Sequence, residues 1–73
     1  MKLVIAPNYR WAEYEMWALG LKTAEWRIVN EAWDLRGVAR GSDIYVFGAA
    51  ELTREKREAL EVAATRKMKV IIR

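Results

Sequence analysis

The stretch LVIAP, residues 3–7, decides the fold class, because four apolar residues follow one another without alternation before Pro7 ends the run. A strand with one solvent-exposed face alternates apolar and polar residues. An unbroken apolar run is instead typical of a strand in a parallel sheet that helices cover on both sides. Residues 44–47 (IYVF) and 70–72 (VII) have the same character. Residues 26–29 (WRIV) are a shorter candidate, so the sheet has four strands, or three if this segment is irregular.

The segments between these runs predict two helices. Asn8 can cap a helix over about residues 9–19 by accepting a backbone hydrogen bond, and Gly20 can end it in a left-handed conformation. Thr53 can cap a second helix over about residues 54–67 in the same way. The chain therefore runs strand, helix, strand, short connection, strand, helix, strand.

Right-handed crossovers convert this order into a small α/β domain over residues 1–73, a Rossmann-like βαββαβ parallel sheet in two or three layers. We expect the strand order 2-1-3-4, because the connection over residues 30–42 can then pass the first strand on its way to the third. Residues 32–35 are expected to form one helical turn in this connection. Large aromatic side chains dominate small cores, so Trp26 and Trp33 are both expected in the core.

The composition excludes much catalytic chemistry. The chain has no cysteine and no histidine, which removes disulfides, thiolate zinc sites and imidazole bases. Neighbouring carboxylates, Glu13 with Glu15 and Glu31 with Asp34, are expected to be exposed, and exposure does not favour acid–base catalysis. We therefore expect no enzyme activity, no cofactor and no metal site.

The distribution of apolar residues indicates a cytoplasmic protein. Hydrophobic residues make up 53% and charged residues 32% of the chain, the balance of a folded globular protein. No apolar run approaches the roughly 18 residues that a membrane span needs. The apolar run near the start is too short for the core of a signal peptide. No membrane association is expected.

One candidate ligand site lies where the strand order reverses, because open parallel sheets bind ligands beyond the carboxyl ends of the strands there. Asn8, Tyr9, Arg10 and Glu51 would meet at this point and could hold a nucleotide or phosphoester. The loop lacks the glycines that let backbone approach a pyrophosphate. Asn8 acting only as a helix cap is the alternative interpretation.

A second candidate surface is basic. The net charge of +3 comes mainly from the end of the chain, where the surplus is Arg66, Lys67, Lys69 and Arg73. Such groups can neutralise phosphates and give nonspecific nucleic-acid affinity. The favoured alternative is structural, because cations complement the end of a helix and charges beside a strand keep it soluble. Nucleic acid is therefore not the partner we expect.

The first predicted helix carries more aromatic side chains than one small sheet can cover. Ala12, Met16 and Leu19 form the stripe that should face the sheet. Tryptophan and tyrosine are preferred anchors of protein–protein contacts, so the remaining aromatic surface predicts an interface. Its predicted residues are Trp11, Tyr14, Trp17 and Ala18. A homodimer is the simplest form of such an interface. The alternative interpretation is that Trp11 wraps a sheet edge and Trp17 is a lone surface residue.

Several motifs resemble small uncharacterised accessory proteins of mycobacteriophages and other actinobacteriophages. The resemblance covers about residues 1–50 and rests on LVIAPNYR, Gly20-Leu21, Trp26-Arg27-Ile28-Val29, Leu35-Arg36-Gly37 and an apolar strand ending at Gly48. It implies a non-enzymatic phage protein that acts on a bacterial host protein in the host cytoplasm. It carries over no catalytic residue.

Overall fold

A four-stranded parallel sheet forms the centre of the computed structural model, which describes residues 1–39 and 41–73. Its strands and helices are β1 (Lys2–Ile5), α1 (Tyr9–Ala18), β2 (Trp26–Ile28), β3 (Asp43–Val46), α2 (Arg54–Thr65) and β4 (Lys69–Ile72). Short 3₁₀ turns lie between them, η1 (Thr23–Glu25), η2 (Ala32–Leu35) and η3 (Ala49–Glu51). The helical turn predicted in the connection from β2 to β3 is confirmed as η2.

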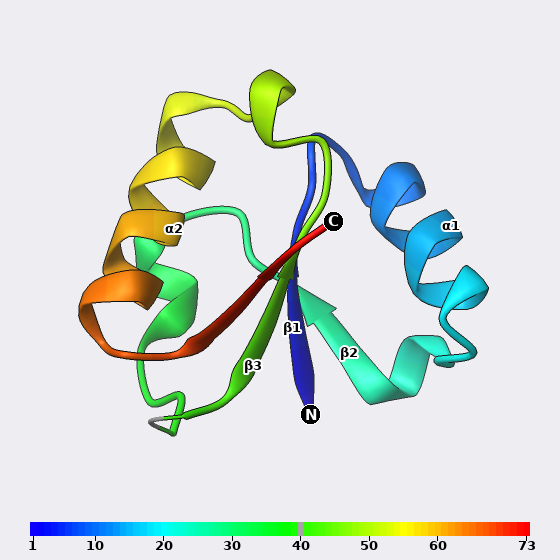
Figure 1. Ribbon diagram of the computed structural model, residues 1–73, viewed down its shortest axis with the longest axis horizontal. Helices are drawn as coiled ribbons and strands as arrows, with labels where there is room; N and C mark the ends of the chain where they lie inside the picture. Colours follow the sequence, from blue (N-terminus) through cyan, green and yellow to red (C-terminus); the bar gives the residue numbers. More distant parts are fainter. Residues whose placement is uncertain (40) are drawn as a thin grey trace.

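The strands lie in the order β2-β1-β3-β4, all parallel, which confirms the predicted topology. The chain moves from β1 to β2 in one direction across the sheet and from β3 to β4 in the other. Right-handed crossovers therefore place α1 and α2 on opposite faces, as Figure 1 shows. Of the two layer arrangements left open by the sequence, the fold has three layers, with η2 packed beside α2.

Two apolar cores lie on the two faces of the sheet, and β1 contributes to both. Leu3 and Ile5 pack in the core on the α2 side, whereas Val4 and Ala6 pack in the core on the α1 side. Successive side chains of a strand point to opposite faces, so a strand between two cores needs apolar residues at every position. This is the physical reason for the unbroken run at residues 3–6.

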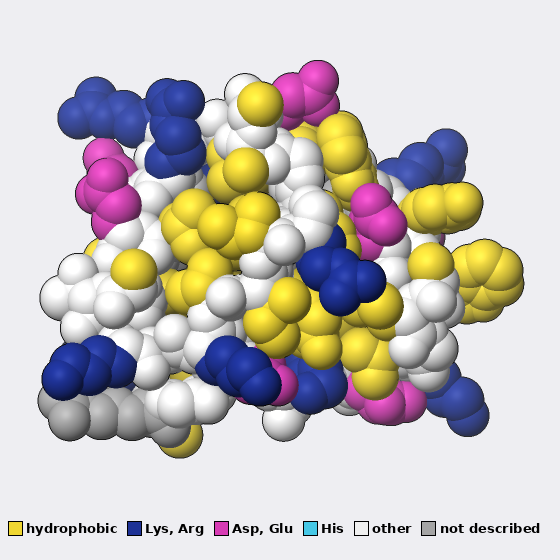
Figure 2. All heavy atoms as spheres, in the orientation of Figure 1, with side chains coloured by type: hydrophobic (Ala, Val, Ile, Leu, Met, Phe, Trp, Pro, Cys, Tyr) yellow, Lys and Arg dark blue, Asp and Glu magenta, His cyan; other side chains and the backbone are white. Residues whose placement is uncertain are grey.

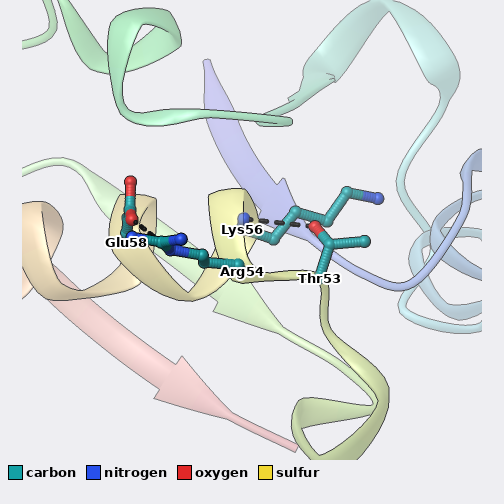
Figure 3. Close-up of polar contacts among 4 residues, drawn as sticks. All are labelled: Thr53, Arg54, Lys56 and Glu58. Carbon is teal, nitrogen blue, oxygen red and sulfur yellow. Dashed lines mark hydrogen bonds and ion pairs between the residues drawn. The ribbon is translucent and has the colours of Figure 1, made fainter.

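The two predicted helix caps are confirmed. Asn8 Oδ1 accepts a hydrogen bond from the backbone N–H of Trp11 at 2.8 Å, and Thr53 Oγ1 accepts one from the N–H of Lys56 at 3.3 Å (Figure 3). The second helix is two residues shorter than predicted. It ends at Thr65 because Lys67 adopts a left-handed φ of 59°, a conformation that stops a helix.

The predictions that Trp33 and Leu19 lie in the core were wrong. Trp33 is 65% exposed, and the Arg36 guanidinium lies 4.5 Å from its ring centroid. A 3₁₀ turn has three residues per turn, so Trp33 and Leu35 point in different directions, and Leu35 is the one buried. Leu19 is exposed because α1 ends one residue before it, and Leu21 packs against the core instead.

Candidate functional site

An aromatic groove lies between α1 and the segment from Leu21 to Trp26. Its volume is about 450 Å³. Trp26 belongs to the floor and is only 5% exposed, while Tyr14 and Trp17 stand on the α1 side at 67% and 73% exposure. The lining residues are Arg10, Glu13, Tyr14, Trp17, Leu21, Lys22, Thr23 and Trp26.

The exposed aromatic rings of the groove lie close together. The ring centroids of Tyr14 and Trp17 are 6.5 Å apart with the planes tilted by 44°. The Trp26 ring pairs with that of Tyr9, whose centroid lies 5.5 Å from its own with the planes tilted by 32°. Tilted aromatic pairs at these distances attract each other, so each of the two pairs is held together by its ring contact.

A second hollow, of about 530 Å³, lies along the other flank of the same helix and is shallower and more open than the groove. Arg10 and Tyr14 line both hollows, and they are four residues apart on α1. Residues at this spacing form a ridge along a helix. The surface therefore consists of a ridge with a hollow on each side.

Of the four predicted interface residues, Trp11 has a different role from the others. Tyr14, Trp17 and Ala18 are exposed. Trp11 is half-buried against the core on the α1 side, and its Nε1 donates to Glu15 Oε2 at 3.2 Å. Replacing Trp11 would therefore disturb the fold, and it is unsuitable for testing an interface.

The predicted ligand residues lie at the ends of β1 and β3 but are not joined. Asn8 uses its side-chain oxygen as the α1 cap, Tyr9 forms a tilted ring pair with Trp26, and Arg10 lines the aromatic groove. Glu51 is exposed in η3. Within the described residues, no hydrogen bond or ion pair connects Glu51 to the other three. Ligand binding there stays a prediction.

Lys56 occupies this region, and sequence reasoning missed it. Its side chain extends from the first turn of α2 toward β1 (Figure 3), where Nζ donates to the carbonyl oxygens of Ala6 at 2.6 Å and Pro7 at 3.1 Å. Lys56 is only 8% exposed. The sequence contained a signal for its burial, because helical spacing places Lys56 on the same face of α2 as the buried Ala59 and Ala63.

Replacing Lys56 by methionine should lower the free energy of unfolding by about 1–3 kcal/mol, because the Ala6 and Pro7 carbonyls lose their donor while the apolar stem is kept. Urea denaturation measures this loss. Arg57→Met, one residue along on the exposed side of α2, is the control and should change stability by less than about 0.5 kcal/mol. Equal stability of the two variants would contradict a structural role for the ammonium group.

The predicted basic cluster is divided. Arg66 donates from Nη1 to the carbonyl of Leu35 and from Nη2 to that of Val38 at 2.8 Å, so it fastens the connection before β3 to the end of α2. Lys67 and Lys69 lie at one end of β4 and Arg73 follows the other end. Four strand residues separate these ends by about 13 Å. Arg66 is engaged inside the fold, and the other three are exposed.

Two of the four carboxylates that were considered for catalysis, Glu15 and Asp34, accept hydrogen bonds within the fold. Glu15 accepts from Trp11, and Asp34 Oδ2 accepts from the backbone N–H groups of Asn30 and Glu31. At the sheet, Lys2 Nζ donates to Asp43 Oδ2 at 3.1 Å, and this hydrogen bond together with the carboxylate charge raises the pKa of Lys2.

Residues 1–39 and 41–73 contain no group of three or more acidic side chains placed to hold a metal ion. Within the same residues, neither helix has the length and apolarity to cross a membrane. Comparisons of the chain with protein-family models, with curated proteins and with solved structures give no significant match.

Proposed function

We propose that the protein works by binding protein surfaces without catalysis, and that its primary contact is self-association through α1. The observation that carries this proposal is the ridge of Arg10 and Tyr14 with a hollow on each side. A ridge beside a hollow on one helix can pack against its own copy, because two-fold symmetry brings each ridge to the other copy's hollow.

The chemistry of this surface supports a protein partner. Tyr14 and Trp17 are exposed and closely spaced, and they line the same groove as the buried Trp26. Tyrosine and tryptophan that fill pockets at the centre of a contact supply most of its binding free energy. The rim carries both charge signs, from Arg10, Lys22 and Glu13, so two copies can bring opposite charges together.

The size of the molecule is compatible with such a dimer. A stable contact buries about 800 Å² per partner, which is about one sixth of the chain's 4917 Å² of accessible surface. The resemblance to phage accessory proteins adds a bacterial host protein as the alternative occupant of the same surface.

Replacing Trp17 by alanine should raise the dimer dissociation constant at least about 30-fold, because a central aromatic anchor contributes about 2 kcal/mol or more. Tyr14→Ala should act in the same direction. Both side chains are exposed in the single chain, so neither change should unfold it. Light scattering over a wide concentration range measures the solution mass of each variant.

Trp33→Ala is the matched control for this experiment. Trp33 is also an exposed tryptophan, but it lies on η2, on the face of the sheet opposite α1. The control should leave the dissociation constant unchanged. A wild-type chain that stays monomeric at high concentration would contradict self-association, and capture of a host protein dependent on Tyr14 and Trp17 would then support the alternative occupant.

A further inference from the structure

The last strand, β4, forms one edge of the sheet and leaves hydrogen-bonding groups free. The backbone N–H groups of Lys69 and Arg73 donate toward β3, to the carbonyls of Ser42 at 3.1 Å and Val46 at 2.9 Å. Backbone groups alternate in direction along a strand, so the N–H and C=O of Val70 and Ile72 point away from β3. Within the described residues no strand lies beyond this edge.

The side chains at this edge combine apolar surface with flanking positive charge. Val70 and Ile71 are half-buried and Ile72 is 64% exposed, while Lys69 and Arg73 are exposed. Figure 1 shows β4 in front of the other strands, and Figure 2, in the same orientation, shows apolar side chains gathered around this position with basic side chains among them.

Lys69, Ile71 and Arg73 share one face of the strand. Val70 packs into the core on the α2 side, so alternation turns these three residues to the α1 side. α1 itself lies over β1 and β2 (Figure 1), and Tyr45 beside Ile71 stays half-buried. Along this accessible face of β4, a positive side chain (Lys69), an apolar one (Ile71) and a second positive one (Arg73) follow one another.

The charges discriminate between occupants of the edge. A second copy that paired antiparallel with β4 and used the outward groups of both Val70 and Ile72 would be centred on Ile71. Lys69 of each copy would then face Arg73 of the other, and like charges directly opposite each other destabilise a strand pair. The same positions attract a strand that carries acidic residues there.

We propose that the free edge of β4 binds an extended segment of another protein as an antiparallel fifth strand, with acidic side chains opposite Lys69 and Arg73 and an apolar side chain opposite Ile71. Backbone hydrogen bonds to Val70 and Ile72 provide affinity, and the acid–apolar–acid spacing provides selectivity. This site is separate from α1 and does not depend on self-association.

The test is an NMR titration of the ¹⁵N-labelled protein with the capped peptide Glu-Val-Val-Val-Glu. The expected result is a saturable chemical-shift change of the Val70 and Ile72 amide signals. The affinity obtained from this titration should fall as the salt concentration rises. A peptide with lysines in place of both glutamates should bind at least about fivefold more weakly, because cross-strand charge pairs of the wrong sign are unfavourable. Equal binding of the two peptides would overturn the proposal.

Backbone pairing is tested on the peptide, so the protein keeps its fold. N-methylation of the second and fourth peptide residues should abolish binding, because their N–H groups face Ile72 and Val70 in the expected register. N-methylation of the central residue, whose N–H points away, is the control and should leave binding intact. Loss of binding in both cases, or in neither, would overturn the strand geometry.

Protein variants provide a second line of evidence. Ile72→Pro removes an outward N–H without removing a donor to β3, so it should abolish peptide binding, whereas Ile72→Val should not. Lys69→Glu should weaken binding about fivefold, and Arg57→Glu, with the same charge change on α2, should not. Shifts at Lys69 and Arg73 with duplex DNA but none with the acidic peptide would assign the edge to nucleic acid and overturn the proposal.

Discussion

Gly48→Ala should lower the free energy of unfolding by at least about 3 kcal/mol, because the new methyl group adds overpacking to an unfavourable backbone conformation. Gly48 has a φ of +59°, and a Cβ there would lie 2.8 Å from Pro7 Cγ and 3.0 Å from Trp11 Cη2. The Pro7 ring cannot easily retreat, since its carbonyl and that of Ala6 are bound by Lys56. Urea denaturation followed by tryptophan fluorescence measures the change.

Gly20→Ala separates the two causes. Gly20 also has a positive φ, +81°, but a Cβ built on it meets nothing within 4 Å. This control should therefore lose only the backbone contribution, about 1 kcal/mol. If both variants were equally destabilised, steric contact of the new Cβ with Pro7 and Trp11 would not explain the loss of stability in Gly48→Ala.

Trp26→Ala should lower the free energy of unfolding by about 3–5 kcal/mol, the usual cost of deleting a buried aromatic side chain. Trp26 is nearly fully buried beneath α1, and Tyr9 would lose the ring with which it pairs. The same change would remove the floor of the aromatic groove, so any dimer should weaken along with the fold. Thermal and urea denaturation measure the stability.

Trp33→Ala is the comparison within the same stretch of sequence. Its ring is exposed and its interaction in the structure is with Arg36, so the change should cost less than about 1 kcal/mol. Similar losses of stability for Trp26→Ala and Trp33→Ala would contradict the different burial of the two side chains. The pair thus tests the point at which the sequence-based expectation was wrong.

The fold was largely predictable because its signals are local. Unbroken apolar runs identified β1, β3 and β4, and the caps at Asn8 and Thr53 identified the starts of both helices. Chirality then limited the topology, since right-handed crossovers leave few ways to arrange four parallel strands. The short strand β2 was predicted from the same pattern with weaker support, and the structure includes it.

The candidate site was predictable only in part. An excess of aromatic residues on α1 indicated an exposed surface, and Tyr14 and Trp17 are exposed. The helical wheel did not separate Trp11 from them, because its burial depends on contact with the sheet core rather than on its helix alone. Likewise, the groove exists because Trp26 and the turn before it lie beside α1, a relation between separate elements.

Chain order, apolar periodicity and capping residues were sufficient for the α/β class, the strand order and the helix starts, because each depends on neighbours a few residues away or on backbone handedness. Contacts between distant parts of the chain required the folded molecule. Lys56 reaches Ala6 across 50 positions, and Arg66 reaches Leu35 across 31. The exposure of β4 also belongs to this group, because a strand becomes an edge only when the rest of the sheet is assembled. The direction of the side chains in η2 also required the folded molecule, because packing of η2 against α2 buries Leu35 and leaves Trp33 exposed.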